Sequence, residues 1–175
     1  MNKRITLLFA SIVAIGAFVV VYSYSQEPET PRYTAPVLSK YDEGPMDVQE
    51  MLELVNKERT DRGIAPLTLH ESLNKSAQLK ADDMWNRDYR DHYLPEDPNA
   101  TLTLEMASYV EPYCESSSEN YVHNNDTGPM TSHNAIYSLM ESKPHKEAIL
   151  NPAYTMIGMG VSNNDVAVQH FCIAK

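Results

Sequence analysis

The chain has 175 residues with two cysteines, and its 14 basic and 24 acidic side chains give a formal net charge of −10. An acidic balance without a Lys/Arg cluster disfavours nucleic acids and anionic lipid surfaces as partners. The length leaves room for one domain of about 130 residues behind a terminal segment.

The first 25 residues have the pattern of an export segment. Lys3 and Arg4 precede an apolar run over 5–22, and no charge appears before Glu27. This run is intermediate in length between a signal-peptide core and a minimal membrane span. The positive flank places the following residues outside the cytoplasm. We therefore expect 1–25 to be a signal peptide or a membrane anchor, and the protein to be secreted or membrane-anchored with its domain outside the cytoplasm.

The segment 26–46 has neither helical nor strand periodicity and contains four prolines among polar residues. Such a composition is typical of an extended linker. The folded domain is then expected over 47–175. Asp47 is a candidate N-cap for its first helix, with Glu50 three residues later as in a capping box.

The domain shows helical patterns first and strand patterns later. Apolar residues at helical spacing predict five helices, over about 47–63, 71–86, 102–110, 132–140 and 144–150. Ser132 is the candidate cap of the fourth. The β-prone runs 156–161 and 166–174 predict a closing hairpin, and a short strand is possible at Tyr121–Val122. The pattern indicates a single α+β domain of two or three layers.

The two cysteines, Cys114 and Cys172, both lie in the part expected to be exported. Such a pair is most simply one disulfide, with two free buried thiols as the alternative. On the chain-entropy model a disulfide here contributes about 4 kcal/mol. His170 lies two residues before Cys172 and shares its face on a strand, so a catalytic Cys–His pair is a further alternative.

Six segments, taken together and in order, resemble one known family. They lie at 54–67, 73–92, 118–121, 142–152, 157–161 and 168–171. They include Ser118-Glu119-Asn120-Tyr121 and the run around Lys143-Pro144-His145, and their specificity comes from the six together. They resemble the CAP domain shared by cysteine-rich secretory proteins, antigen 5 and plant pathogenesis-related proteins, in its bacterial, SCP-like extracellular form.

The resemblance implies an α-β-α sandwich with an open cleft, in which two histidines and one or two glutamates converge. Carried over by position, these residues are His92, Glu119 and His145, with Asn120 beside them in the cleft. Many relatives have a second glutamate where this chain has Ser142. The resemblance therefore implies a cluster of three rather than four residues.

These residue types permit three kinds of chemistry. His92 and His145 suit a divalent metal such as zinc. The cluster also suits acid–base chemistry, because histidine titrates near neutral pH. Alternatively, the three side chains hydrogen-bond one another and order the cleft. The other histidines are expected to be surface residues or hydrogen-bonded core residues, namely His70, His123, His133 and His170. Of these, His123 is an additional candidate for the cleft.

We expect a non-enzymatic module that binds a small apolar, lipid-like, glycan or protein ligand, with a lipid or cell-envelope component as its partner. The alternative is a metal-dependent or acid–base hydrolase of the cell envelope, protease-like, that uses His92, Glu119 and His145. A third interpretation is a purely structural surface protein. Binding is favoured because the sequence has no Gly-x-Ser-x-Gly elbow and no His-Glu-x-x-His motif. If 1–25 is not cleaved, it also contacts the membrane.

Overall fold

The computed structural model describes residues 44–124 and 130–175. The predicted export segment 1–25 and nearly all of the predicted linker 26–46 lie outside these ranges, so that division stays a prediction. No helix within the described ranges is long and apolar enough to cross a membrane. The helices are α1 (Val48–Thr60), α2 (Glu71–Asn86), α3 (Leu104–Val110), α4 (Ser132–Glu141) and α5 (Lys143–Ile149), and the strands are β1 (Thr68–Leu69), β2 (Cys114–His123), β3 (Met156–Ser162) and β4 (Val166–Ala174).

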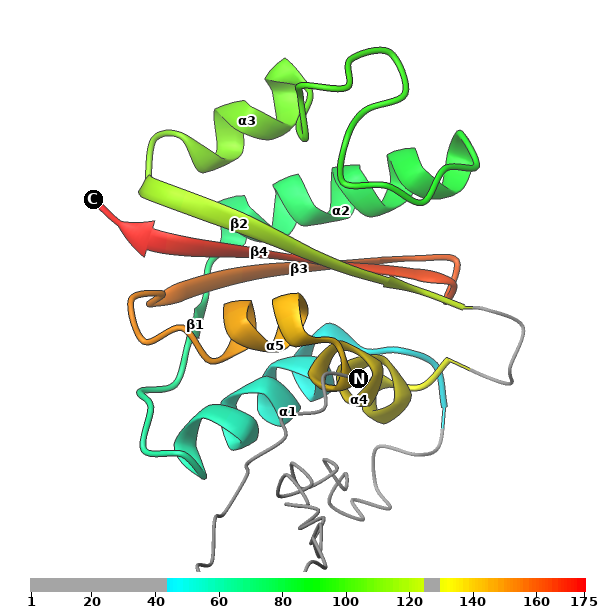
Figure 1. Cartoon of the computed structure of the whole chain (residues 1–175). Helices are drawn as coiled ribbons and strands as arrows, with labels where there is room; N and C mark the ends of the chain where they lie inside the picture. Colours follow the sequence, from blue (N-terminus) through cyan, green and yellow to red (C-terminus); the bar gives the residue numbers. More distant parts are fainter. Residues whose placement is uncertain (1–43, 125–129) are drawn as a thin grey trace, which may run out of the picture. The chain divides into compact units, whose positions relative to one another are not determined.

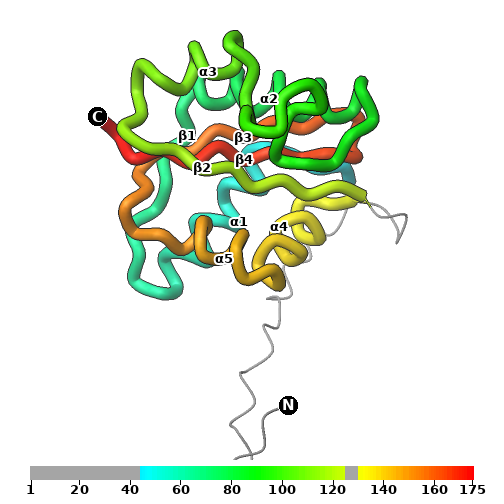
Figure 2. The backbone as a smooth tube through the Cα atoms, turned by 45° about the horizontal axis from the view of Figure 1, so that its top comes forward, coloured from blue at the N-terminus to red at the C-terminus, as the bar shows by residue number. Residues whose placement is uncertain are grey.

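One four-stranded sheet, in the order β1-β3-β4-β2, forms the middle layer. β1 pairs parallel with β3, whereas β4 pairs antiparallel with both β3 and β2. Helices α2 and α3 cover one face of this sheet, and α1, α4 and α5 cover the other (Figure 1, Figure 2). The expected α+β fold, an α-β-α sandwich, is therefore confirmed.

The strand pleat decides which side chains reach the α2 and α3 layer. Val166 and Val168 of β4 pack against the apolar side of α2. Alternate residues of a strand share a face, so His170 and Cys172 point toward the same layer. Glu119 of β2 is the direct cross-strand partner of His170. A carboxylate and an imidazole are thereby brought together between the sheet and its α2–α3 cover.

Close packing of α2 on the sheet requires two glycines in β3. A Cβ added to Gly158 would lie 2.1 Å from the carbonyl carbon of Leu73, and one added to Gly160 would lie 2.3 Å from the backbone nitrogen of Gln78. Neither distance leaves room for a side-chain carbon, because the neighbouring atoms belong to the helix backbone. These glycines therefore set the close approach between α2 and the sheet.

The helix caps agree only partly with the predicted ones. Asp47 caps α1, accepting hydrogen bonds from the backbone nitrogens of Gln49 and Glu50 at 2.9 and 3.0 Å. The cap of α4 is Thr131 rather than the predicted Ser132. The Ser132 hydroxyl instead accepts a hydrogen bond from the Asp47 backbone nitrogen at 2.9 Å, so it joins α4 to the start of α1.

Strand β2 is much longer than the predicted pair Tyr121–Val122. It runs for 10 residues, through a segment rich in Ser, Glu and Asn. Such residues are poor strand formers, but β-propensity depends strongly on context. Here the continuous ladder with β4 supplies that context. The very short strand β1 was not predicted either, and it exists through its parallel pairing with β3.

The predicted disulfide is confirmed. Cys114, at the start of β2, is bonded to Cys172 of β4, with their Cα atoms 5.4 Å apart. The bond joins two neighbouring strands across a sequence separation of 58 residues. Both sulfur atoms are therefore committed to it, which removes the alternatives of free thiols and of a catalytic Cys–His pair.

Candidate functional site

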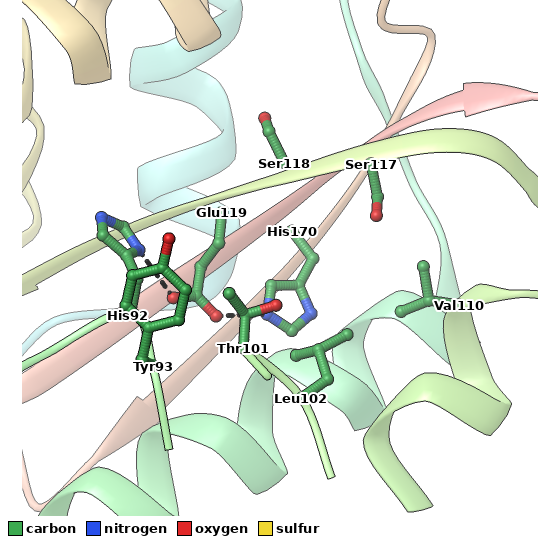
Figure 3. A pocket seen from close by; sticks show the side chains of 9 residues that line it. All are labelled: His92, Tyr93, Thr101, Leu102, Val110, Ser117, Ser118, Glu119 and His170. Carbon is green, nitrogen blue, oxygen red and sulfur yellow. Dashed lines mark hydrogen bonds and ion pairs between the residues drawn. The ribbon is translucent and has the colours of Figure 1, made fainter. Parts of the chain in front are cut away.

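Glu119 bridges two histidines from different parts of the chain (Figure 3). Its Oε1 lies 2.9 Å from His92 Nδ1, and its Oε2 lies 3.1 Å from His170 Nε2. The Glu119 side chain is only 8% exposed, whereas that of His92 is 38% exposed. One of the two histidines is thus buried with the carboxylate, and the other stands at its solvent edge.

The environment keeps the Glu119 carboxyl ionised. Burial by itself raises its pKa, but hydrogen bonds from His170 and His92 outweigh burial, and the charge interactions with His170 and then with Lys80 act in the same direction. The net effect is a pKa below the ordinary value. An ionised carboxylate offers only acceptors, so each imidazole donates an N–H to it. In the neutral ring the second nitrogen is then an acceptor.

A buried lysine holds the segment that carries His92. Lys80 of α2 is fully buried, and its Nζ donates to the backbone oxygens of His92 at 2.7 Å and Thr101 at 3.0 Å. The ammonium also lies 5.2 Å from the centre of the Tyr89 ring. Burial lowers the Lys80 pKa, while Glu119 opposes that shift. Lys80 therefore fixes both ends of the loop 92–101 against α2.

A pocket of about 310 Å³ opens beside the Glu119 cluster. Leu102 and Val110 provide apolar wall, while Glu119 and the two histidines form a polar end (Figure 3). The full lining consists of His92, Tyr93, Thr101, Leu102, Val110, Ser117, Ser118, Glu119 and His170. A polar end beside an apolar wall is the usual composition of a small-molecule site.

The predicted residue His145 lies beside this pocket rather than in its lining. Its ring centre is 6.2 Å from that of His92 and 6.5 Å from that of Tyr121. Burial lowers the His145 pKa, and the neighbouring His92 lowers it further. The Glu119 oxygens are hydrogen-bonded to His92 and His170 rather than to His145. The structure therefore brings His92 and Glu119 into direct contact and leaves His145 as a neighbour of His92.

Asn120 points to the opposite face of the sheet. It is 2% exposed, and its Nδ2 donates to the backbone oxygen of His145 at 3.0 Å and to Gln169 Oε1 at 3.3 Å. Asn120 thus connects β2 to α5, the helix that carries His145. Its effect on the site runs through the position of that helix rather than through the pocket lining.

Comparison with known proteins assigns the fold to a family. The model of the cysteine-rich secretory protein family, CAP, matches residues 52–174. The chain belongs to the CAP family. It is 32% identical over 124 residues to YkwD, an uncharacterised protein of Bacillus subtilis (strain 168), covering 70% of this chain and 46% of YkwD. The chain thus spans about half the length of this relative.

Solved structures support the CAP fold. An extracellular SCP-domain protein of Bacillus anthracis (strain Ames) superposes with a TM-score of 0.59 at 20% identity, covering 84% of this chain and 45% of that one. An outer surface protein of Borrelia burgdorferi also gives a TM-score of 0.59, at 18% identity, covering 75% of this chain and 98% of that one. At sequence identities this low, the similarity to these two structures shows a shared fold only.

His170 of this CAP domain is a site residue that the sequence analysis missed. It was expected to be an ordinary surface or core residue, yet it is hydrogen-bonded to Glu119 and lines the pocket. Lys80 was missed too, although a signal existed. It interrupts the apolar stripe of α2 at a position between Ala77 and Met84, three and four residues away, where a helical side chain faces the core.

The remaining candidate for the cleft, His123, lies beyond the pocket lining. Its ring stacks at 6.3 Å from that of Tyr121, and its Nδ1 lies 3.3 Å from the backbone oxygen of Asn124. It therefore lies at the C-terminal end of β2, outside the pocket lining.

The cluster does not match a three-ligand zinc site. Among the described residues, no group of three or more His, Cys, Asp or Glu side chains is placed to hold a metal ion. His92 and His145 supply two imidazoles, whereas catalytic zinc sites use three protein ligands. In addition, Nδ1 of His92 is engaged by Glu119. The described residues of this cluster therefore do not fit a catalytic zinc ion.

Proposed function

We propose that this CAP domain is a non-enzymatic binding module that works outside the cytoplasm and takes a small ligand with an apolar, lipid-like body. The pocket beside Glu119 carries the proposal. Its volume of about 310 Å³ lies at the lower end of the range of small-molecule sites. Leu102 and Val110 provide contact area for an apolar body, and the Glu119 cluster orients a polar end.

Three observations support a location outside the cytoplasm. The N-terminal sequence has the pattern of an export segment. The disulfide between Cys114 and Cys172 suits an oxidising compartment. Finally, two of the similar solved proteins are described as an extracellular protein and an outer surface protein.

The test is to identify what the natively produced protein carries. The full chain is purified from its own membrane or medium and extracted with organic solvent, and the extract is analysed by mass spectrometry. We expect an apolar molecule in the wild-type extract. In Ser117→Trp, a large ring on the pocket side of β2 occupies the space and the molecule is lost.

Ser116→Trp is the matched control. Ser116 is the neighbouring exposed residue of the same strand, and strand alternation turns it to the other face of the sheet. It should retain the molecule. Empty extracts from the wild type, or equal extracts from wild type and Ser117→Trp, contradict binding in this pocket.

An acid–base hydrolase of the cell envelope is the second candidate. The observation in its favour is the 2.9 Å contact between His92 and Glu119, because a carboxylate that orients an imidazole is part of many general-base sites. It ranks second because, among the described residues, the His–Glu pair has neither a free thiol nor a three-ligand metal group beside it, and such a pair alone is weak evidence for catalysis. Turnover of envelope peptides or glycans that disappears in Glu119→Gln supports hydrolysis over binding.

A further inference from the structure

One nitrogen of the His170 ring has no partner within the described part of the chain. The residue is 2% exposed, and its Nε2 is occupied by Glu119. Its Nδ1 is buried and makes no hydrogen bond to any described residue. Buried polar atoms in native proteins are nearly always paired, because an unpaired one loses its interaction with water and gains nothing in return. This atom therefore points to a partner that is not among the described residues, such as a bound ligand.

The Glu119 contact determines what kind of partner His170 needs. The carboxylate is ionised and can only accept, so Nε2 of His170 carries the hydrogen of their bond. In the neutral imidazole, Nδ1 is then the nitrogen with a free lone pair. The partner that this neutral form of the ring needs is accordingly a hydrogen-bond donor.

His170, the residue with the unpaired nitrogen, lines the pocket. The His170 ring lines it together with Leu102, Val110 and Ser117. In Figure 3 the edge of the ring away from Glu119 is turned toward Val110 and Ser117. Val110 in turn packs with the disulfide of Cys114. The end of the pocket at Val110, called its inner end here, is thus apolar, and the ring edge with the unpaired nitrogen of His170 is turned toward it.

The charges around the pocket limit which polar head group of a ligand can bind there. A carboxylate or phosphate head is repelled by the ionised Glu119 beside it, and an isolated charge of either sign loses its hydration against Leu102 and Val110. An ammonium head is attracted by Glu119, but this attraction is opposed by its desolvation and by the Lys80 charge, which already interacts with Glu119. An uncharged hydroxyl provides the donor at the lowest desolvation cost.

We propose that the inner end of this pocket is a subsite for an uncharged hydroxyl group on an apolar body, with His170 Nδ1 as its acceptor. The inference deepens the proposed binding function and rests on it. His170 is then the residue that distinguishes an alcohol from a hydrocarbon, an ether or a carboxylate of the same size.

The experiment compares ligands that differ only in their polar end. The full chain is labelled with ¹⁵N-histidine and titrated with octanol, with heptyl methyl ether, which lacks the donor, and with octanoate, which is charged. We expect octanol to bind roughly three- to ten-fold more tightly than the ether, as one hydrogen bond predicts, and octanoate to bind most weakly. The Nδ1 resonance of His170 should be that of an unprotonated nitrogen and should shift on addition of octanol.

The variant His170→Gln separates the two nitrogens. A glutamine amide can still donate to Glu119 but has no acceptor at the Nδ1 position, so the preference for octanol over the ether should vanish. His123→Gln makes the same substitution outside the pocket lining and should keep the preference. A wild-type protein that binds the alcohol and the ether equally overturns the hydroxyl subsite but leaves the binding function standing.

Three further outcomes also overturn the subsite. The first is a protonated Nδ1 in the free neutral ring, because that nitrogen would then be a donor. The second is a shift of the Nδ1 resonance that is the same for octanol and for the ether, because a trapped water would then be the partner. The third is the absence of any octanol binding. The native extraction with Ser117→Trp reports separately on whether the pocket binds anything.

Discussion

His170 and Glu119 are directly paired residues of β4 and β2, and His170 Nε2 lies 3.1 Å from Glu119 Oε2. Directly opposite side chains of an antiparallel pair stand about 5 Å apart at Cβ, so the sheet register itself creates this contact. A slip of one residue would turn His170 to the other face. His92, in contrast, is held by a loop that depends on Lys80. The carboxylate thus has one partner fixed by the sheet and one fixed by a side chain.

The contribution of Glu119 to stability should depend on pH. Its pKa in the folded protein is below the ordinary 4.5, so the folded state binds this proton more weakly than the unfolded state. The stabilisation is fully present above pH 4.5 and is lost as the pH falls through the lower folded pKa. We expect the difference in Tm between wild type and Glu119→Gln to narrow on going from about pH 5.5 to about pH 3.

Glu105→Gln is the matched control for this measurement. Glu105 is an exposed residue in the first turn of α3, and its substitution should change Tm little over the same range. A Tm difference for Glu119→Gln that stays constant down to the lowest pH contradicts a lowered carboxyl pKa.

The pKa of His145 should respond to His92. It lies below the ordinary 6.5 because of burial first and the neighbouring His92 second. The folded state therefore binds this proton more weakly, and His145 reduces stability as the pH falls from 6.5 through the folded pKa. In His92→Gln the pKa should rise part of the way toward 6.5. NMR titration of the His145 ring protons measures it, and His123→Gln should leave the value unchanged. A value unmoved by His92→Gln contradicts the electrostatic contact.

Local patterns in the sequence predicted much of the fold. The apolar stripe predicted α2 with its observed bounds Glu71–Asn86, because side chains three and four residues apart lie on one helix face. The closing hairpin was predicted from its turn, where Asn163 and Asn164 take positive φ angles of 49° and 54°. Both features are determined by neighbours along the chain. The pairing of His92 with Glu119 came from the family resemblance.

Features that depend on contacts between distant parts of the chain could not be predicted from the sequence. The residues of β2 are poor strand formers, so only pairing with β4 makes them a strand. The role of His170 depends in turn on that pairing, because no spacing along the chain relates it to Glu119. Asn120 follows Glu119 directly, yet the pleat turns it to the opposite face. Predicting these placements requires the register of two strands that lie far apart in the sequence.

The disulfide should contribute measurably to the stability of the domain. Replacing both Cys114 and Cys172 by alanine opens a loop of 58 residues, and the chain-entropy model gives a loss of about 4 kcal/mol, less any native strain. Denaturant unfolding of the oxidised wild type and of the double variant measures this difference. A reductant should lower the stability of the wild type and leave that of the variant unchanged. Non-reducing mass spectrometry of the wild type should show the mass two hydrogens below the reduced form, and an equal mass contradicts the bond.

Lys80 should matter both for stability and for the position of His92. Lys80→Met keeps the apolar stem in α2 but removes the ammonium that donates to the oxygens of His92 and Thr101. Leaving these groups without their charged donor should cost about 3 kcal/mol of unfolding free energy. The loop 92–101 should also exchange its amide hydrogens faster, because its two anchors are lost.

Lys75→Met separates this effect from a general effect of losing a lysine from α2. Lys75 lies on the same helix, but it is exposed and pairs with Glu71 one turn earlier, at 3.0 Å. Such surface pairs contribute about 0.5 kcal/mol or less, so this variant should unfold nearly as the wild type does. Hydrogen exchange at 92–101 should also be unchanged in it. If Lys80→Met and Lys75→Met behave alike, the buried ammonium does not hold the loop, and the solvent-edge histidine beside Glu119 must be positioned by the Glu119 contact alone.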